Sequence, residues 1–155
     1  MTGARIVQIN VSRGGVPKRP VSMATVGEPG LSGDEHLNQV HHGGPERAVS
    51  LFAIERIEAL AAEGHPIFAG ATGENVTIGG LDWQRVIPGA RLRLGADVLL
   101  EVTRFAAPCK TIRAAFKDGY FNRLSGKVYP GWSRAYARVI TCGLIRAGDA
   151  VQIVE

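Results

Sequence analysis

Glycine divides much of this sequence into short apolar segments, and this pattern limits the folds open to the chain. There are 20 glycines among 155 residues, which is about twice the usual share. Glycine adopts the positive φ angles of tight turns without steric cost. Frequent turns between short apolar runs favour short β-strands over long helices. We therefore expect one mainly β domain over residues 1–155.

The hydrophobic pattern places the strands and one clear helix. One helix is predicted over residues 55–63, because Ile54, Ile57 and Leu60 share a face and Gly64 follows them. A second, shorter helix is expected over residues 112–117. Residues 28–44 lack periodicity and are expected to form a long loop. Alternating or continuous apolar residues predict strands at residues 5–11, 20–26, 47–53, 75–78, 91–94, 97–103, 136–140 and 150–154. Many short strands with one or two helices favour a β-barrel or a sandwich.

Positive charge is concentrated in the last third of the chain. Residues 102–148 contain nine lysines and arginines and a single acid, Asp118, so this segment carries +8 while the whole chain carries +4. Such a segment suits an anionic partner, either a phosphate-bearing small molecule or a nucleic acid. An exposed, solvated basic face would give the same count.

Nothing in the sequence predicts a membrane or secreted location. There is no run of about 18 apolar residues that would span a bilayer. Residues 1–10 lack the charged and then apolar build of a secretory signal. Two cysteines are too few to hold a secreted fold together and suit a reducing compartment. We therefore expect a cytoplasmic protein without membrane contact.

Cys109 is the residue that best suits covalent or metal chemistry. Arg104, Lys110 and Arg113 are its neighbours in the sequence, and nearby positive charge favours the thiolate, which attacks electrophiles and ligates soft metals. A small, inert buried side chain is the alternative for Cys109. Cys142 lies among apolar residues and is expected in the core.

Three further segments offer polar groups to a ligand, although each alone is a weak signal. Gly43 and Gly44 would let a ligand approach the backbone, and Arg47 would then bind a phosphate or carboxylate. Asn75 carries both a donor and an acceptor, as recognition of a heterocycle requires. Lys18 follows a glycine-rich turn and suits a phosphate. Ordinary turns, caps and surface side chains are the alternatives in each case.

Several short motifs follow one another along the chain in a particular order. They are Gly15-Val16-Pro17-Lys18, Gly33-Asp34, His42-Gly43-Gly44-Pro45, Thr72-Gly73-Glu74-Asn75-Val76-Thr77, Pro88-Gly89-Ala90-Arg91-Leu92, Pro108-Cys109 and Ala147-Gly148-Asp149. Their order resembles that of the MOSC domain, the family named after the C-terminal domain of molybdenum cofactor sulfurases. The segment 130–139 also resembles stand-alone bacterial members, so the resemblance extends over nearly the whole chain.

This resemblance implies a mainly β fold with a barrel core that binds the molybdenum cofactor, a pterin with a phosphate and a metal-binding dithiolene. In members that reduce N-hydroxylated compounds, the matching cysteine ligates molybdenum, so Cys109 is expected to be the metal ligand and catalytic residue. The expected contacts to the cofactor are Lys18, His42, Gly43, Gly44, Arg47, Glu74, Asn75, Thr77, Arg104, Lys110 and Arg134. The basic segment would then attract an anionic cofactor.

The sequence leaves three functions open, and we favour an enzyme. The first is a molybdenum-dependent oxidoreductase for N-hydroxylated or N-oxide compounds, which takes electrons from a redox partner protein. The second is a sulfur carrier that receives a persulfide on Cys109 from a desulfurase. The third is a non-enzymatic module for anions or nucleic acid. Only ten aromatic residues are available for base stacking, although seven of them lie in the basic segment. This option ranks below the others because of the family resemblance.

The sequence also departs from larger members of the family. Cofactor sulfurases have a pyridoxal-phosphate domain with a Schiff-base lysine, and other members have additional helices or an N-terminal domain. We expect none of these in this chain, so it is not expected to be a complete sulfurase. A homodimer would help so small a domain to close a cofactor pocket.

Overall fold

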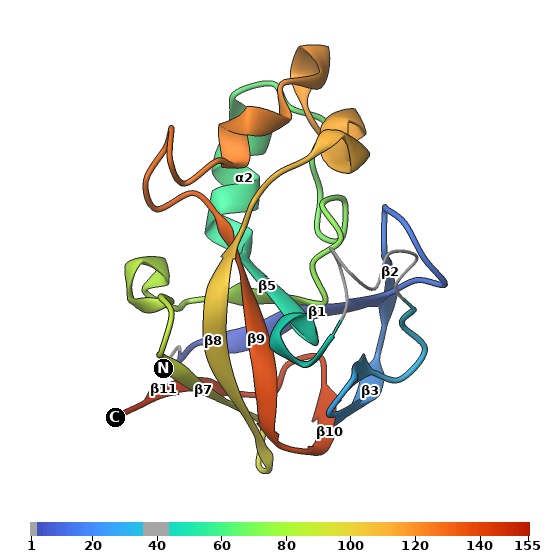
Figure 1. The fold of residues 1–155 in the computed structure, drawn as a ribbon, viewed down its shortest axis with the longest axis vertical. Helices are drawn as coiled ribbons and strands as arrows, with labels where there is room; N and C mark the ends of the chain where they lie inside the picture. The colour runs from blue at the N-terminus through green and yellow to red at the C-terminus, as the bar shows by residue number, and fades with distance from the viewer. Residues whose placement is uncertain (1–2, 36–43) are drawn as a thin grey trace.

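The computed structural model describes residues 3–35 and 44–155, which form a large β-sheet, a small β-sheet and a cap of helices (Figure 1). The large sheet has the strand order β11-β7-β8-β9-β5-β6-β1-β2, and the small sheet has the order β10-β3-β4. The strands are β1 (Arg5–Val11), β2 (Arg19–Val21), β3 (Met23–Gly27), β4 (Gly30–Leu31), β5 (Val49–Ala53), β6 (Val76–Gly79), β7 (Arg91–Leu94), β8 (Val98–Ala106), β9 (Arg134–Thr141), β10 (Gly143–Arg146) and β11 (Val151–Val154).

The mainly β class predicted from the sequence is confirmed, although the large sheet does not close into a continuous barrel. Within the described residues, β5 and β6 pair in parallel and every other strand pair is antiparallel. The strand β1, next to one edge of the sheet, approaches the opposite edge strand β11 where Arg5 and Ala150 form an isolated bridge. Backbone bonds at Ile6 strengthen this approach, because its N–H donates to Asp149 and its carbonyl accepts from Gly148, each at 2.8 Å. The sheet therefore curls almost into a barrel.

The helix α2 (Ile54–Ala62) follows β5 directly and lies at the same end of the molecule as the 3-10 helices of residues 110–124 (Figure 1). The predicted helix over residues 55–63 is thus confirmed within one residue at each end. Ile57 and Leu60 are buried, as expected for its apolar face. Gly64 follows the helix at φ +102°, a conformation that glycine adopts without the cost of a Cβ.

The described part of the chain also contains five 3-10 helices: η1 (Pro45–Arg47), η2 (Trp83–Arg85), η3 (Lys110–Ala115), η4 (Lys117–Gly119) and η5 (Phe121–Leu124). An ion pair ties η5 to the end of α2, since the Arg123 guanidinium donates to both Glu63 carboxylate oxygens at 3.0 and 2.8 Å. The rings of Tyr129 and Trp132 lie 4.4 and 4.2 Å from the same guanidinium carbon. This cluster anchors the connection between η3 and β9.

The structure corrects several details of the predicted elements. The strand expected over residues 20–26 is two strands, β2 and β3. Pro20 is accommodated because β2 is an edge strand, where a missing N–H costs little. The helix expected over residues 112–117 is the 3-10 helix η3, which begins at Lys110. The two-residue strand β4 lies within the expected loop 28–44, and β10 was not predicted.

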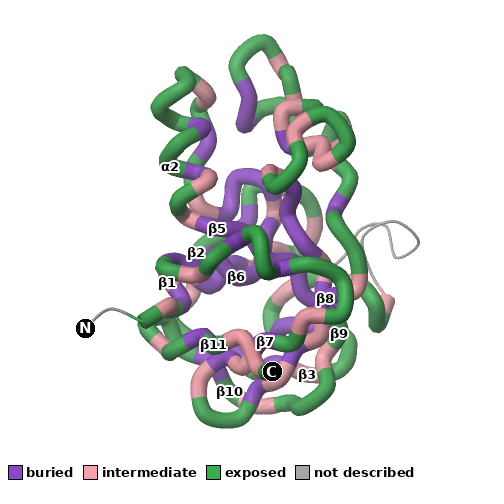
Figure 2. The backbone as a smooth tube through the Cα atoms, turned by 90° about the vertical axis from the view of Figure 1, so that its left-hand side faces the viewer, coloured by how far each residue is buried: buried purple, intermediate pink, exposed green. Residues whose placement is uncertain are grey.

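Cys142 is exposed, so its predicted place in the core is wrong. It lies where β9 ends and β10 begins, outside the tightly packed part of the sheet. Figure 2 shows that the buried residues concentrate in the central strands, while the outer turns remain exposed. Phe52, Leu51 and Ile78 in β5 and β6 are among the fully buried side chains. No helix in the described part of the chain has the length and apolar character needed to cross a bilayer.

Candidate functional site

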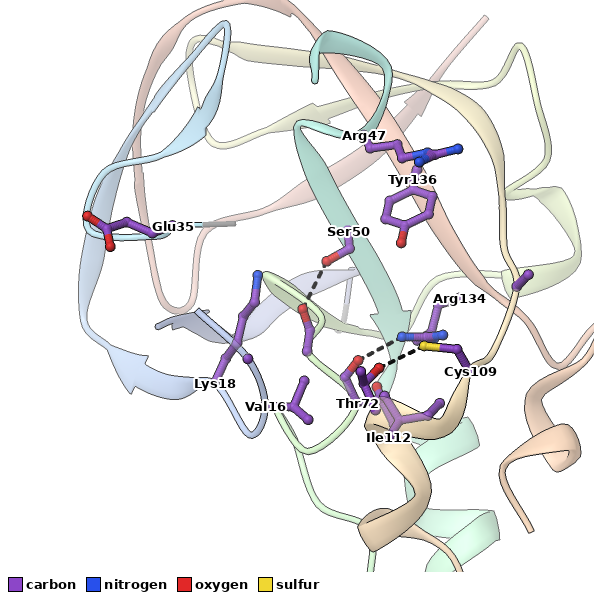
Figure 3. Close-up of a pocket in the computed structure, with 14 residues that line it drawn as sticks. Val16, Lys18, Glu35, Arg47, Ser50, Thr72, Cys109, Ile112, Arg134 and Tyr136 are labelled. Carbon is purple, nitrogen blue, oxygen red and sulfur yellow. Dashed lines mark hydrogen bonds between the residues drawn. The ribbon is translucent and has the colours of Figure 1, made fainter. Parts of the chain in front are cut away.

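A cavity of about 240 Å³ opens between the β5 and β9 strands, η3 and two glycine-containing loops. Figure 3 shows side chains from all of these segments converging on it. The residues that line the cavity are Gly15, Val16, Lys18, Glu35, Arg47, Ser50, Thr72, Gly73, Ala107, Cys109, Thr111, Ile112, Arg134 and Tyr136. Segments that are far apart in the sequence therefore build one site.

Cys109 lies on one wall of this cavity, immediately before η3. Its side chain is partly exposed and free of any disulfide. The sulfur lies 2.7 Å from the Thr111 hydroxyl oxygen (Figure 3). No cluster of three or more histidine, cysteine, aspartate or glutamate side chains that could hold a metal exists within residues 3–35 and 44–155. A metal at this wall would therefore take a single sulfur ligand from the described residues.

Arg134, at the start of β9, is a buried cation that lies beside Cys109 (Figure 3) and interacts electrostatically with it. Its Nη1 donates to the Thr72 carbonyl oxygen at 2.7 Å. Its Nε is buried and has no hydrogen-bond partner. Burial lowers the pKa of Arg134, while Tyr136, Glu74 and Cys109 act in the opposite direction. A buried guanidinium that lines a cavity is a candidate for binding an anion, because charged donors favour charged acceptors.

Lys18 also lines the cavity, but a neighbouring acid neutralises it. Its Nζ lies 2.9 Å from Asp34 Oδ2, and the two side chains are 9% and 1% exposed. Arg47 reaches the cavity from the end of η1, with its guanidinium carbon 5.8 Å from the centre of the Tyr136 ring (Figure 3). The cavity is therefore rich in cationic groups, but these groups differ in their existing interactions with other residues of the protein.

Asn75 does not line the cavity, although the sequence suggested that it binds the pterin. Its side chain is buried behind the wall, where Oδ1 accepts from the Ser50 backbone N–H at 3.0 Å and from the Ser50 hydroxyl at 3.2 Å. Its Nδ2 donates to the Asn10 carbonyl at 3.2 Å and to Asp34 Oδ2 at 2.9 Å. These contacts occupy its amide, so Asn75 holds the site together instead of facing a ligand.

Glu74 and Thr77 also lie behind the cavity wall and not on it. Glu74 is fully buried. One of its carboxylate oxygens accepts from the Thr72 hydroxyl at 2.8 Å, and the other accepts from the Gly70 N–H at 2.9 Å and from the Thr77 hydroxyl at 3.0 Å. These bonds fix the loop that presents Thr72 and Gly73 to the cavity.

The structure thus brings four of the predicted site residues together at the cavity, namely Lys18, Arg47, Cys109 and Arg134. Two predicted contacts lie elsewhere: Arg104 is exposed and pairs with Glu46 at 3.1 Å, and Lys110 is exposed on η3. Gly44 precedes η1 at φ +92° and is not part of the lining. His42 and Gly43 lie outside the described residues.

Sequence reasoning missed several lining residues, notably Ser50, Thr72 and Tyr136. Ser50 is the polar residue in the otherwise apolar strand β5, and this exception was a usable signal. Thr72 belongs to the motif of residues 72–77, but its role includes its backbone carbonyl, which accepts a hydrogen bond from Arg134. Tyr136 gave no local signal, because strands commonly contain aromatic residues.

Similarity to known proteins agrees with this architecture. A reductase from Gibberella moniliformis is 33% identical over 130 residues, which cover 81% of this chain and 23% of that protein. Protein YiiM of Escherichia coli is 31% identical over 135 residues, covering 83% of this chain and 58% of that protein. The crystal structure of YiiM from Geobacillus stearothermophilus superposes with a TM-score of 0.75 at 27% identity, covering 98% of this chain and 75% of that chain. The chain therefore spans less than two thirds of both curated relatives.

The fold and the site define a mainly β protein whose pocket presents one cysteine beside buried cations. The MOSC domain model matches residues 38–152. The chain belongs to the MOSC domain family, which is associated with the molybdenum cofactor, as the order of its motifs predicted.

Proposed function

We propose that the cavity binds the molybdenum cofactor through Cys109 and that the protein reduces N-hydroxylated or N-oxide compounds. The observation that carries this proposal is that the Cys109 sulfur and the incompletely bonded Arg134 line one cavity. A reductase among the similar proteins supports an oxidoreductase role.

The residues present fit such a cofactor in chemistry. A thiolate is a suitable ligand for a soft metal centre, and Cys109 offers one to the cavity. Arg134 and Arg47 both line the cavity and bring positive charge for an anionic group. The cavity of about 240 Å³ is slightly smaller than pockets for drug-sized ligands, which hold roughly 300–1,000 Å³. The described residues would therefore enclose part of the cofactor.

The proposed reaction consumes two electrons and two protons for each oxygen atom removed, as in R–NHOH + 2 e⁻ + 2 H⁺ → R–NH₂ + H₂O. When bound, the cofactor supplies the electron-transfer chemistry, and a redox partner protein is the proposed source of the electrons. The protein's own residues would bind and orient the cofactor and the substrate. Arg134 and the Tyr136 hydroxyl are hydrogen-bond donors at the cavity, while Val16, Ala107 and Ile112 exclude water from it.

The decisive experiment measures molybdenum and pterin in protein purified from a host that makes the cofactor. We expect about one molybdenum per chain in the wild type, for one thiolate site, and loss of the metal in Cys109→Ser. Cys142→Ser is the matched control, because Cys142 is exposed and outside the cavity. Metal retained by Cys109→Ser would refute the ligand assignment, and absence of both metal and pterin from the wild type would refute the proposal.

Sulfur transfer is a second candidate, because Cys109 is partly exposed at a cationic cavity, where a persulfide anion would be stabilised. A desulfurase persulfide, E–S–SH, would give its outer sulfur to the Cys109 thiol, which yields E–SH and Cys109–S–SH. Intact mass after incubation with a cysteine desulfurase and cysteine should then increase by about 32 Da, one sulfur atom. An increase that persists in Cys109→Ser, or no increase in the wild type, would exclude this route.

A further inference from the structure

The cations of the cavity are not equivalent, because two of them are balanced in different ways. Lys18 forms a direct ion pair with Asp34 at 2.9 Å, and both side chains are almost fully buried. Asp34 is held in turn by the Ser12 N–H at 2.9 Å and by the Asn75 amide at 2.9 Å. Such a closed, buried pair has little charge left for a ligand, because each group already has its partner.

Arg134 is buried without a direct ion pair among the described residues. Its Nη1 bonds to a neutral group, the Thr72 carbonyl, and its Nε lacks a partner. An isolated buried charge is costly unless it is paired or hydrogen-bonded. Because the Arg134 side chain lines the cavity, an oxyanion there would supply the missing negative charge.

Arg134 is linked to a negative charge, the Glu74 carboxylate, through Thr72. Thr72 connects the two residues, because its carbonyl accepts from Arg134 at 2.7 Å and its hydroxyl donates to Glu74 at 2.8 Å. The Gly70 N–H and the Thr77 hydroxyl hold the other Glu74 oxygen. Glu74 also interacts electrostatically with the Arg134 guanidinium. It therefore fixes the position of Thr72 and partly offsets the charge of Arg134.

We infer that Arg134, and not Lys18, binds the oxyanion of a ligand in this cavity. Glu74 is a positioning residue, which orients Arg134 through Thr72 and lowers the affinity of Arg134 for the anion. The inference relies on the proposed function only for the identity of the complete ligand. It assigns Glu74, a residue of the Gly-Glu-Asn motif that does not line the cavity, a role in ligand affinity.

Inorganic phosphate is the probe, and the full-length protein is purified from a host that lacks the cofactor. A ligand that binds only the folded state raises Tm by an amount that grows with the logarithm of its concentration relative to Kd. Tm is therefore measured against phosphate concentration, with chloride at equal ionic strength as the reference. We expect phosphate to raise the Tm of the wild type and to have no such effect on Arg134→Met. Arg134→Lys replaces that variant if Arg134→Met does not fold, and should lose most of the effect, since lysine lacks the planar fork of arginine.

The Lys18→Met/Asp34→Asn double variant removes the closed ion pair as a unit and should keep the phosphate effect. Two substitutions separate the roles of Glu74. Glu74→Gln keeps the length and removes the charge, and should tighten phosphate binding by roughly tenfold, as expected for one unit charge nearby at a partly buried site. Glu74→Asp keeps the charge, loses the reach to Thr72, and should weaken binding.

The inference is overturned if phosphate acts no differently from chloride on the wild type, or if both Arg134 variants keep the effect. Loss of the effect in the Lys18/Asp34 double variant would assign the anion to Lys18 instead. Equal weakening by Glu74→Gln and Glu74→Asp would reduce Glu74 to a structural role. Because this assay needs no cofactor, a wild type without molybdenum would refute the proposed function and leave the phosphate results unaffected.

Discussion

The Asn75 amide is expected to carry much of the stability of the site, and Asn75→Ala tests this directly. The substitution removes four hydrogen bonds of 2.9–3.2 Å, two with Ser50, one with Asn10 and one with Asp34. Asn75 is 1% exposed, so its former partners remain buried and water cannot easily replace it. At roughly 1 kcal/mol for each bond, and more where a buried group is left without a partner, the expected loss is about 3–5 kcal/mol. This is a large part of the 5–15 kcal/mol typical of a small domain.

The assay is urea unfolding of protein free of cofactor, followed by circular dichroism, with Asn122→Ala as the control because Asn122 is exposed. The control should change the free energy of unfolding by less than about 0.5 kcal/mol. If Asn75 instead faces a ligand, Asn75→Ala would leave the stability of the free protein intact and lower only the cofactor content. A loss below about 1 kcal/mol would therefore refute the network reading.

Two further predictions concern the walls of the site and the cap. Gly73→Ala should destabilise the protein by about 1–2 kcal/mol from its positive φ alone. It should lose more than Gly89→Ala does in a thermal melt, because a Cβ on Gly73 would come within 2.8 Å of Val16 Cγ1, whereas Gly89 has open space at a similar φ; equal losses would show that Val16 yields freely. The hydrogen bond to Arg123 lowers the pKa of Glu63 from its ordinary 4.5, so the pair stabilises the fold above that pH and the gain fades as the pH falls below it. Glu63→Gln should flatten this part of the stability–pH curve by less than about 1 kcal/mol, since Glu63 is 42% exposed; an unchanged slope would contradict the assignment.

The local hydrophobic pattern was sufficient to predict the regular elements that depend mainly on residues near them in the sequence. The alternation in residues 5–11 predicted β1 with its observed bounds, and the apolar face of residues 55–63 predicted α2. It was insufficient where a short segment depends on a distant partner. A bend at Ser22 splits one expected strand into two, because β2 pairs with β1 in the large sheet while β3 pairs with β10 and β4 in the small one.

The motifs predicted which segments form the site better than they predicted which side chains face it. Glu74, Asn75 and Thr77 were expected at the ligand, yet all three are buried behind the wall. The cause is the parallel pairing of β5 and β6, which sets Ser50 beside Asn75 and uses the amide of Asn75 between the strands. The long-range partners of Asn75 and Thr77 lie 25 to 67 positions away in the sequence, so sequence spacing does not predict these contacts. The carboxylate of Glu74 is instead held by residues two to four positions away.

The sequence by itself thus determined the mainly β class, the family and Cys109 as the candidate residue at the site, because these depend on local periodicity and on the order of short motifs. Only the tertiary structure decided how the cations differ. Lys18 and Arg134 are both basic residues in the sequence, but one is paired with Asp34 and the other is buried beside a carbonyl with an unused N–H. That difference arises from the charges and acceptors that folding brings within a few ångströms, and a sequence does not state these distances.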